Sequence, residues 1–212
     1  MEKDTSRIEA FSDGVFGVAI TLLAIDIGVD INDIQSHHAL EATTNGELTH
    51  LLTALWPKVF TYFNSFAAVL LMWMAHHRIF KLLRTASNRL LLTNGLVLFV
   101  IVLVPWPTKT MGQFIFTGAF KTAVIFYTGY CVIIAGTFVL LMGAAKSRNG
   151  GMLLPGAHAN DIKALTRGAW TGFLLNATIC AVAFFVPLAA LVLNFCMWIF
   201  WAFAARERKK EV

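Results

Sequence analysis

Charged residues and cysteines are both scarce in this sequence. Asp, Glu, Lys and Arg make up 14% of the 212 residues, whereas hydrophobic residues make up 58%. Such a composition excludes a soluble domain, whose surface must meet water. Cys131, Cys180 and Cys196 stand singly in apolar runs without C-x-x-C spacing, so neither a disulfide framework nor a thiolate metal site is indicated. We therefore expect an integral membrane protein with no metal and no other cofactor.

The basic residues predict membrane topology rather than a nucleic-acid partner. The net charge is +5, but Lys and Arg lie at the ends of apolar runs and form no stripe with interleaved aromatic residues. Only Lys58, Lys109 and Lys121 fall on one predicted side of the membrane, and the other basic residues fall on the opposite side. Because basic residues gather on the cytoplasmic side, this asymmetry places both termini in the cytoplasm.

The apolar runs predict an all-α membrane protein. Several runs approach or exceed the roughly 20 residues that a helix needs to cross a bilayer. No internal repeat is visible, so residues 1–212 are expected to form a single transmembrane domain of six helices. Gly168 and Gly172 in the fifth helix either allow close helix contact or fall there by chance. The expected transmembrane helices are 8–29, 50–76, 88–106, 119–143, 164–187 and 188–205.

The first helix carries polar groups that a lipid-facing helix would not tolerate. Only twelve uncharged residues separate Asp13 from Asp26, about 18 Å of helix, which is shorter than the hydrocarbon core. Ionisable groups in membrane helices usually face the bundle interior or a water-filled cavity. Helical spacing also places one stripe of side chains on a single face, which indicates either a pore lining or an ordinary buried seam. The stripe consists of Val18, Thr21, Leu22 and Ile25.

A motif at the start of this helix points to a family. Arg7-x-x-x-Phe11-Ser12-Asp13, followed by "GVFGVAITLLAIDI", closely resembles the signature of the endolysosomal potassium channel family and its prokaryotic homologues. "WMAHHRIF" at 73–80 and "NGLVLFVIVLVPWPT" at 94–108 also resemble the second and third helices of that family. The resemblance implies a potassium-permeable channel for monovalent cations, lined by the first helix and without a re-entrant selectivity-filter loop. No T-V-G-Y-G stretch occurs in this sequence, in agreement with the last point.

The resemblance also implies an assembly and a place in the cell. Prokaryotic members carry one six-helix unit and form homotetramers, so this chain is expected to form a homotetramer in the lipid bilayer of a prokaryotic inner membrane. Position by position, the main hydrophobic constriction falls on Val18, a hydroxyl layer on Thr21, and deeper apolar rings on Leu22 and Ile25. Valine is shorter than the isoleucine or leucine usual at the constriction, so the closed pore is expected to be slightly wider.

The polar residues of the motif are expected to hold the helix in place. Arg7 would repel a cation, so we interpret Arg7, Phe11, Ser12 and Asp13 as a structural network. In the family the motif pairs with donors on the second helix, which makes Trp73 and His77 the preferred partners of Asp13. His76 is the alternative, because neighbouring helix positions differ in direction by about 100°.

Two acidic residues lie beyond the stripe. Asp26 and Asp30 are expected to concentrate cations at the outer pore mouth. For Asp30 a solvated acidic loop is an equal alternative.

Two other functions remain open from the residues alone. A proton- or cation-coupled transporter could use Glu9, Asp13 and His77 as a relay, although no inverted repeat is visible. A haem protein could use His76 and His77 as axial ligands, but a second inward-facing histidine at similar depth is lacking.

Overall fold

The fold is an antiparallel arrangement of long helices, seen in a computed structural model that describes residues 5–25, 44–146, 152–154 and 158–207. Side chains are described up to residue 203. Within these residues no strand occurs, and the isolated bridge between Leu83 and Leu153 is the only β-type pairing described. The helices are α1 (Thr5–Ile25), α3 (Asn45–Ala54), α4 (Trp56–Phe80), α5 (Asn88–Val102), α6 (Pro105–Phe114), α7 (Phe120–Ala145), α8 (Ala159–Ala183) and α9 (Pro187–Glu207).

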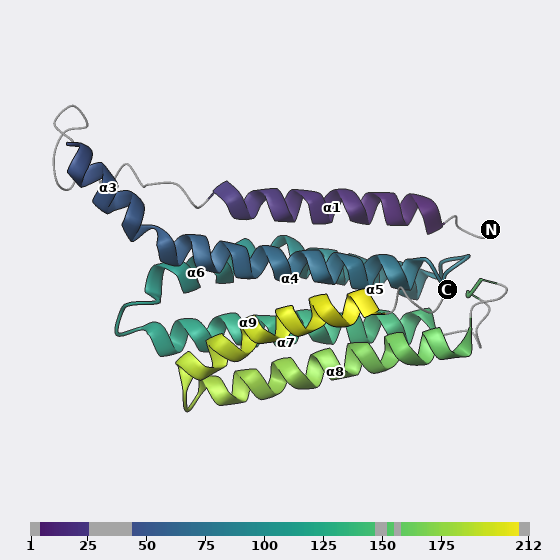
Figure 1. The fold of residues 1–212 in the computed structure, drawn as a ribbon. Helices are drawn as coiled ribbons and strands as arrows, with labels where there is room; N and C mark the ends of the chain where they lie inside the picture. The colour runs from purple at the N-terminus through teal and green to yellow at the C-terminus, as the bar shows by residue number, and fades with distance from the viewer. Residues whose placement is uncertain (1–4, 26–43, 147–151, 155–157, 208–212) are drawn as a thin grey trace.

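The expected all-α membrane fold is confirmed. Four described stretches are long and apolar enough to cross a bilayer, namely α1, α3 with α4, α5 with α6, and α7. The helix α8 is less apolar because it contains polar residues such as Arg167 and Asn176, and the apolar part of α9, Pro187–Phe203, is shorter. Both helices nevertheless run beside α7 in the same bundle (Figure 1).

Two of the expected helices are broken. The expected helix 88–106 ends as α5 at Val102, and α6 begins at Pro105, because proline has no backbone N–H to continue the helical hydrogen bonds. The expected helix 50–76 begins earlier, as α3, and continues as α4 to Phe80. Thr44 and Glu47 form a capping box that fixes the start of α3.

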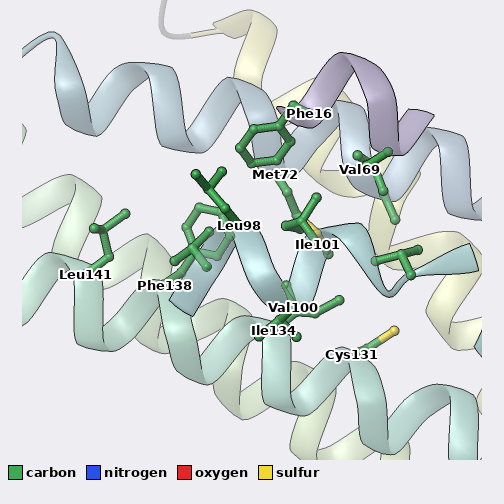
Figure 2. Packing of buried hydrophobic residues seen from close by; sticks show 14 of the residues in the cluster. Phe16, Val69, Met72, Leu98, Val100, Ile101, Cys131, Ile134, Phe138 and Leu141 are labelled. Carbon is green, nitrogen blue, oxygen red and sulfur yellow. The ribbon is translucent and has the colours of Figure 1, made fainter. Parts of the chain in front are cut away.

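The helix α1 lies along one edge of the bundle (Figure 1). It packs against α4, α5 and α6, whereas α7, α8 and α9 form the opposite side. Inside a bilayer, helices are held together mainly by close packing and by hydrogen bonds between helices. Figure 2 shows this packing, with Phe16 of α1, Val69 and Met72 of α4, Leu98 and Ile101 of α5, and Ile134 and Phe138 of α7.

A buried polar cluster joins α4, α7 and α9. The amide Nδ2 of Asn64 donates to the hydroxyl of Tyr127 at 2.8 Å and to Oδ1 of Asn194 at 3.2 Å. The indole Nε1 of Trp198 donates to the same Oδ1 at 3.1 Å. Because polar groups in hydrocarbon must be satisfied by other protein groups, this cluster fixes the register of the three helices.

Backbone contacts tie three segments together at the end of the bundle where α4 ends. Leu83 and Leu153 form the isolated bridge, and the amide of Leu154 donates to the carbonyl of Leu82 at 2.9 Å. The hydroxyl of Thr5 donates to the carbonyl of Leu83 at 3.1 Å. The start of α1 is therefore attached to the turn that follows α4, and that turn to the segment before α8.

Candidate functional site

The motif carboxylate Asp13 is bound by the second helix. The indole Nε1 of Trp73 donates to Oδ1 of Asp13 at 2.7 Å, so the structure brings together two residues of the expected network. The ring of Trp73 stacks on that of His77, with centroids 5.6 Å apart and planes 17° from parallel. The donor is thereby held in place about two helical turns before the end of α4.

His77 does not bind Asp13, in contrast to the preferred prediction. Its Nδ1 lies 2.6 Å from Oε1 of Glu9, one turn before Asp13 on α1. The reason is geometric, because Trp73 and His77 lie one turn apart on α4 and therefore face two positions one turn apart on α1. Asp13 therefore accepts from Trp73, and Glu9 contacts His77.

His76 joins a different chain of hydrogen bonds, which the sequence analysis missed. Its Nε2 lies 2.7 Å from Oδ1 of Asn94, and Nδ2 of Asn94 donates to the hydroxyl of Ser12 at 3.0 Å. Ser12 in turn donates to the carbonyl of Ile8 at 2.8 Å. His76, Asn94 and Ser12 are all buried, so these bonds join α4, α5 and α1 where water is excluded. The only signal in the sequence was an amide inside the apolar run that begins at Leu90.

The two faces of α1 have opposite environments. Ser12, Phe16, Ala19 and Leu23 are buried against the bundle. The expected pore stripe lies on the other face. Val18 is 54% exposed and Ile25 is 72% exposed, and Thr21 and Leu22 are exposed as well. The hydroxyl of Thr21 donates to the carbonyl of Val18 at 2.8 Å, which leaves its oxygen lone pairs available on the exposed face.

Arg7 and Phe11 share this exposed face, since they precede Val18 by eleven and seven residues. Both side chains are exposed in the single chain, so they do not anchor α1 within it as the sequence analysis expected. Within the chain, α1 is held by Thr5 at its start and by the contacts of Glu9, Ser12 and Asp13 with α4 and α5.

The two acidic residues of the expected pore mouth, Asp26 and Asp30, lie outside the described residues. Among the residues that the structure describes, no group of three or more His, Cys, Asp or Glu side chains is placed to hold a metal ion.

Comparison with known proteins places this arrangement in a family. The family profile described as "Endosomal/lysosomal potassium channel TMEM175" matches residues 7–105. A potassium channel of Chamaesiphon minutus is 36% identical over 166 residues, which cover 78% of this chain and 77% of that protein. The chain belongs to the TMEM175 family. A potassium channel of Streptomyces collinus is 39% identical over 112 residues, which cover 53% of this chain and 50% of that protein.

Solved structures of TMEM175 proteins agree with the fold. A lysosomal potassium-selective channel TMEM175 homolog from Chamaesiphon minutus superposes with a TM-score of 0.80 at 30% identity, covering 94% of this chain and 97% of that one. The potassium channel MtTMEM175 superposes at 0.60 and 19% identity, which shows a shared fold.

The animal TMEM175 proteins match only part of the chain. The human protein, described as an endosomal/lysosomal proton channel, is 40% identical over 92 residues, which cover 43% of this chain and 18% of that protein. The profile match at 7–105 spans α1, α4 and α5, which carry every residue of the network around Asp13. The resemblance that the motif indicated is thus confirmed at the level of the family.

Proposed function

We propose that this chain is the subunit of a potassium-permeable cation channel, a homotetramer whose central pore is lined by α1. The TMEM175 relatives of comparable length are described as potassium channels. The observation in this chain that carries the proposal is the exposed apolar face of α1, which no other described helix of the chain covers. Four copies that met along this face would cover it and would enclose a path.

The stripe supplies the proposed gate. Around a fourfold axis, Val18 forms the narrow ring, Thr21 a layer of hydroxyl oxygens, and Leu22 and Ile25 further apolar rings. Rings of branched apolar side chains can close a pore by expelling water from it. The Asp13–Trp73 and Ser12–Asn94–His76 contacts lie on the opposite side of α1 and hold it at a fixed angle to the bundle.

The orientation follows from the distribution of basic residues. The start of α1 and the ends of α4, α7 and α9 lie at the same end of the bundle (Figure 1). This end carries Lys81, Arg84, Lys146 and Arg89, and the positive-inside rule supports a cytoplasmic position for it. We propose the inner membrane of a prokaryote as the location, because the relatives of comparable length are bacterial potassium channels.

A coupled transporter is less well supported. Its relay would need protons to pass among Glu9, Asp13 and His77. His77 contacts Glu9, but Asp13 accepts from the indole N–H of Trp73, a group that does not titrate, so Asp13 is separated from the other two residues. A channel passes unitary currents down the electrochemical gradient, whereas a coupled transporter does not.

Recording in planar bilayers with opposed potassium and sodium gradients tests the proposal. We expect unitary currents with a reversal potential displaced toward that of potassium. Replacing the constriction by an amide, Val18→Asn, should wet the ring, raise the open probability or leak, and weaken the preference for potassium.

The matched control is Ile133→Asn, which changes a β-branched residue of similar exposure, 56% against 54% for Val18, on α7 instead of α1. We expect this variant to conduct like the unmodified protein. If Val18→Asn and Ile133→Asn both conducted with the conductance and selectivity of the unmodified protein, α1 would not be the pore lining. If the unmodified protein gave no unitary currents, the channel proposal itself would be wrong.

A further inference from the structure

A long apolar groove lies away from α1, among α4, α7, α8 and α9. It encloses about 990 Å³ of space not filled by protein, part of which opens to the surroundings. Leu71 and Ala75 of α4 lie on one wall, Leu165 and Ala169 of α8 on the other, and Phe138 of α7 also lines it. The lining is apolar apart from Arg78 and Asn176.

The groove exists because α8 presents its smallest residues to it. Gly168 and Gly172 both line the groove, and a Cβ atom added to either would meet nothing within 4 Å. The pair therefore does not mediate close helix contact within the chain, one of the two interpretations that the sequence left open. α8 packs against α7 and α9, while α4 packs against α1, α6 and α9, so α4 and α8 face each other across the gap.

The length of the groove matches one leaflet of a bilayer. Its lining on α8 runs from Ala164 to Asn176, about 18 Å of helix axis. One leaflet of hydrocarbon is about 15 Å thick, half of the roughly 30 Å core. An extended acyl chain of a membrane lipid therefore fits along the groove without folding back.

Positive charge lies at one end of the groove. Arg78 lines it in the last turn of α4, beside the start of α8, because α4 ends and α8 begins at the same end of the bundle (Figure 1). Exposed Lys163 and Arg167 flank the lining residues on the first turns of α8, where Asp161 is the acidic residue. Arginine binds phosphate groups with paired hydrogen bonds, and basic pockets between membrane helices bind anionic headgroups.

We propose that this groove binds an anionic glycerophospholipid, with one acyl chain along α8 between Gly168 and Gly172 and the phosphate at Arg78. Apolar length and terminal positive charge are complementary to this one class of ligand, since a zwitterionic headgroup would add a choline cation to the end of the groove where Arg78, Lys163 and Arg167 already carry positive charge. The site is separate from the proposed pore, because α1 contributes no lining residue.

Native mass spectrometry of the purified full-length assembly tests the site, with phosphatidylglycerol as the probe and phosphatidylcholine as the neutral comparison. We expect phosphatidylglycerol to stay bound and phosphatidylcholine to be displaced. Arg78→Gln removes a charge-assisted hydrogen-bond donor and should weaken retention at least about tenfold. Gly172→Leu extends a side chain into the groove from a position where an added Cβ meets nothing within 4 Å, and should lower retention to a similar degree.

Two matched variants act as controls. Lys146→Gln removes an exposed positive charge at the same end of the bundle, and Gly143→Leu adds a side chain to an exposed helical glycine of α7 that lies outside the groove. Both should retain phosphatidylglycerol. Equal retention in all four variants, or equal binding of phosphatidylcholine, would overturn the proposal.

A second measurement uses the unmodified protein and so does not depend on the folding of any variant. Phosphatidylglycerol with a photoreactive diazirine on its acyl chain should label peptides from residues 164–176 of α8, and excess unlabelled phosphatidylglycerol should suppress that label. Labelling only outside the groove, as would occur if a second copy of the chain covered it, would overturn the proposal. Neither measurement uses ion current, so failure of the channel proposal would leave these results unaffected.

Discussion

Trp73 donates its indole N–H to the carboxylate of Asp13 across the contact between α4 and α1, at a distance of 2.7 Å. This bond gives a partner to an acidic residue that is partly buried against α4. Trp73→Phe keeps an aromatic ring, although a smaller one, and removes the donor, so we expect a loss of about 1–2 kcal/mol in the stability of the folded protein in detergent. Thermal unfolding followed by size-exclusion chromatography measures this loss.

Asp13→Asn should lose less stability than Trp73→Phe, because its side-chain oxygen still accepts from the indole. Trp170→Phe on α8 is the control, since its half-exposed ring packs edge-on against Phe173. An equal shift in Trp73→Phe and Trp170→Phe would show that ring size, and not the bond to Asp13, stabilises the protein.

Asn94 connects His76 to Ser12 and is the residue whose removal should cost most in this region. Asn94→Leu leaves two buried polar groups without their partner, and an unmade hydrogen bond of a buried group costs roughly 1–3 kcal/mol. In a double-mutant cycle with Ser12→Ala, we expect a coupling between about 0.6 and 1.7 kcal/mol, which are the average and the maximum for hydrogen bonds between membrane helices. Additive losses, measured by the same thermal assay, would contradict a direct role for this bond.

Thr21 places a hydroxyl oxygen on the exposed face of α1. Thr21→Val has nearly the same shape and removes the lone pairs, so the proposed pore should lose a polar layer and conduct less, without a change in thermal stability. Single-channel amplitude in symmetric potassium measures this. Thr93→Val on α5, which also removes a hydroxyl bonded within its own helix, is the control and should conduct normally.

Leu22 should meet its equivalents from other subunits if α1 surrounds a central axis. In a background with Cys196, the exposed cysteine, changed to serine, Leu22→Cys should form disulfide-linked dimers under mild oxidation. Leu140→Cys, an exposed position on α7, should remain monomeric on a non-reducing gel. Dimers from Leu140→Cys but not from Leu22→Cys would place a different helix at the subunit contact.

The sequence allowed prediction of features that depend on local pattern. Apolar runs placed the long helices, and helical spacing placed Val18, Thr21, Leu22 and Ile25 on one face, which the structure leaves exposed. The family resemblance also named the partners of α1 on α4. Each of these rests on periodicity or on a motif, both of which can be read along a single chain.

Features that depend on packing between helices were not predictable in the same way. The assignment of His77 to Glu9 and of His76 to Asn94 follows from the relative rotation and height of three helices. Asn94 itself lies in an apolar run whose spacing does not show which side faces α1. The break at Pro105 could have been predicted, since proline cannot continue the hydrogen bonds of a helix. The continuous apolar run around Pro105 instead indicated a single helix.

Thr5 attaches the first residue of α1 to the turn after α4, so that α1 is fixed at this end. Val18 lies about 20 Å and Ile25 about 30 Å along the helix from Thr5. A rigid tilt of α1 about this attachment displaces Ile25 by roughly one and a half times as much as Val18. In the proposed pore, such a motion would widen the ring of Ile25 most and would leave the narrowest point near Val18, which lies closer to Thr5.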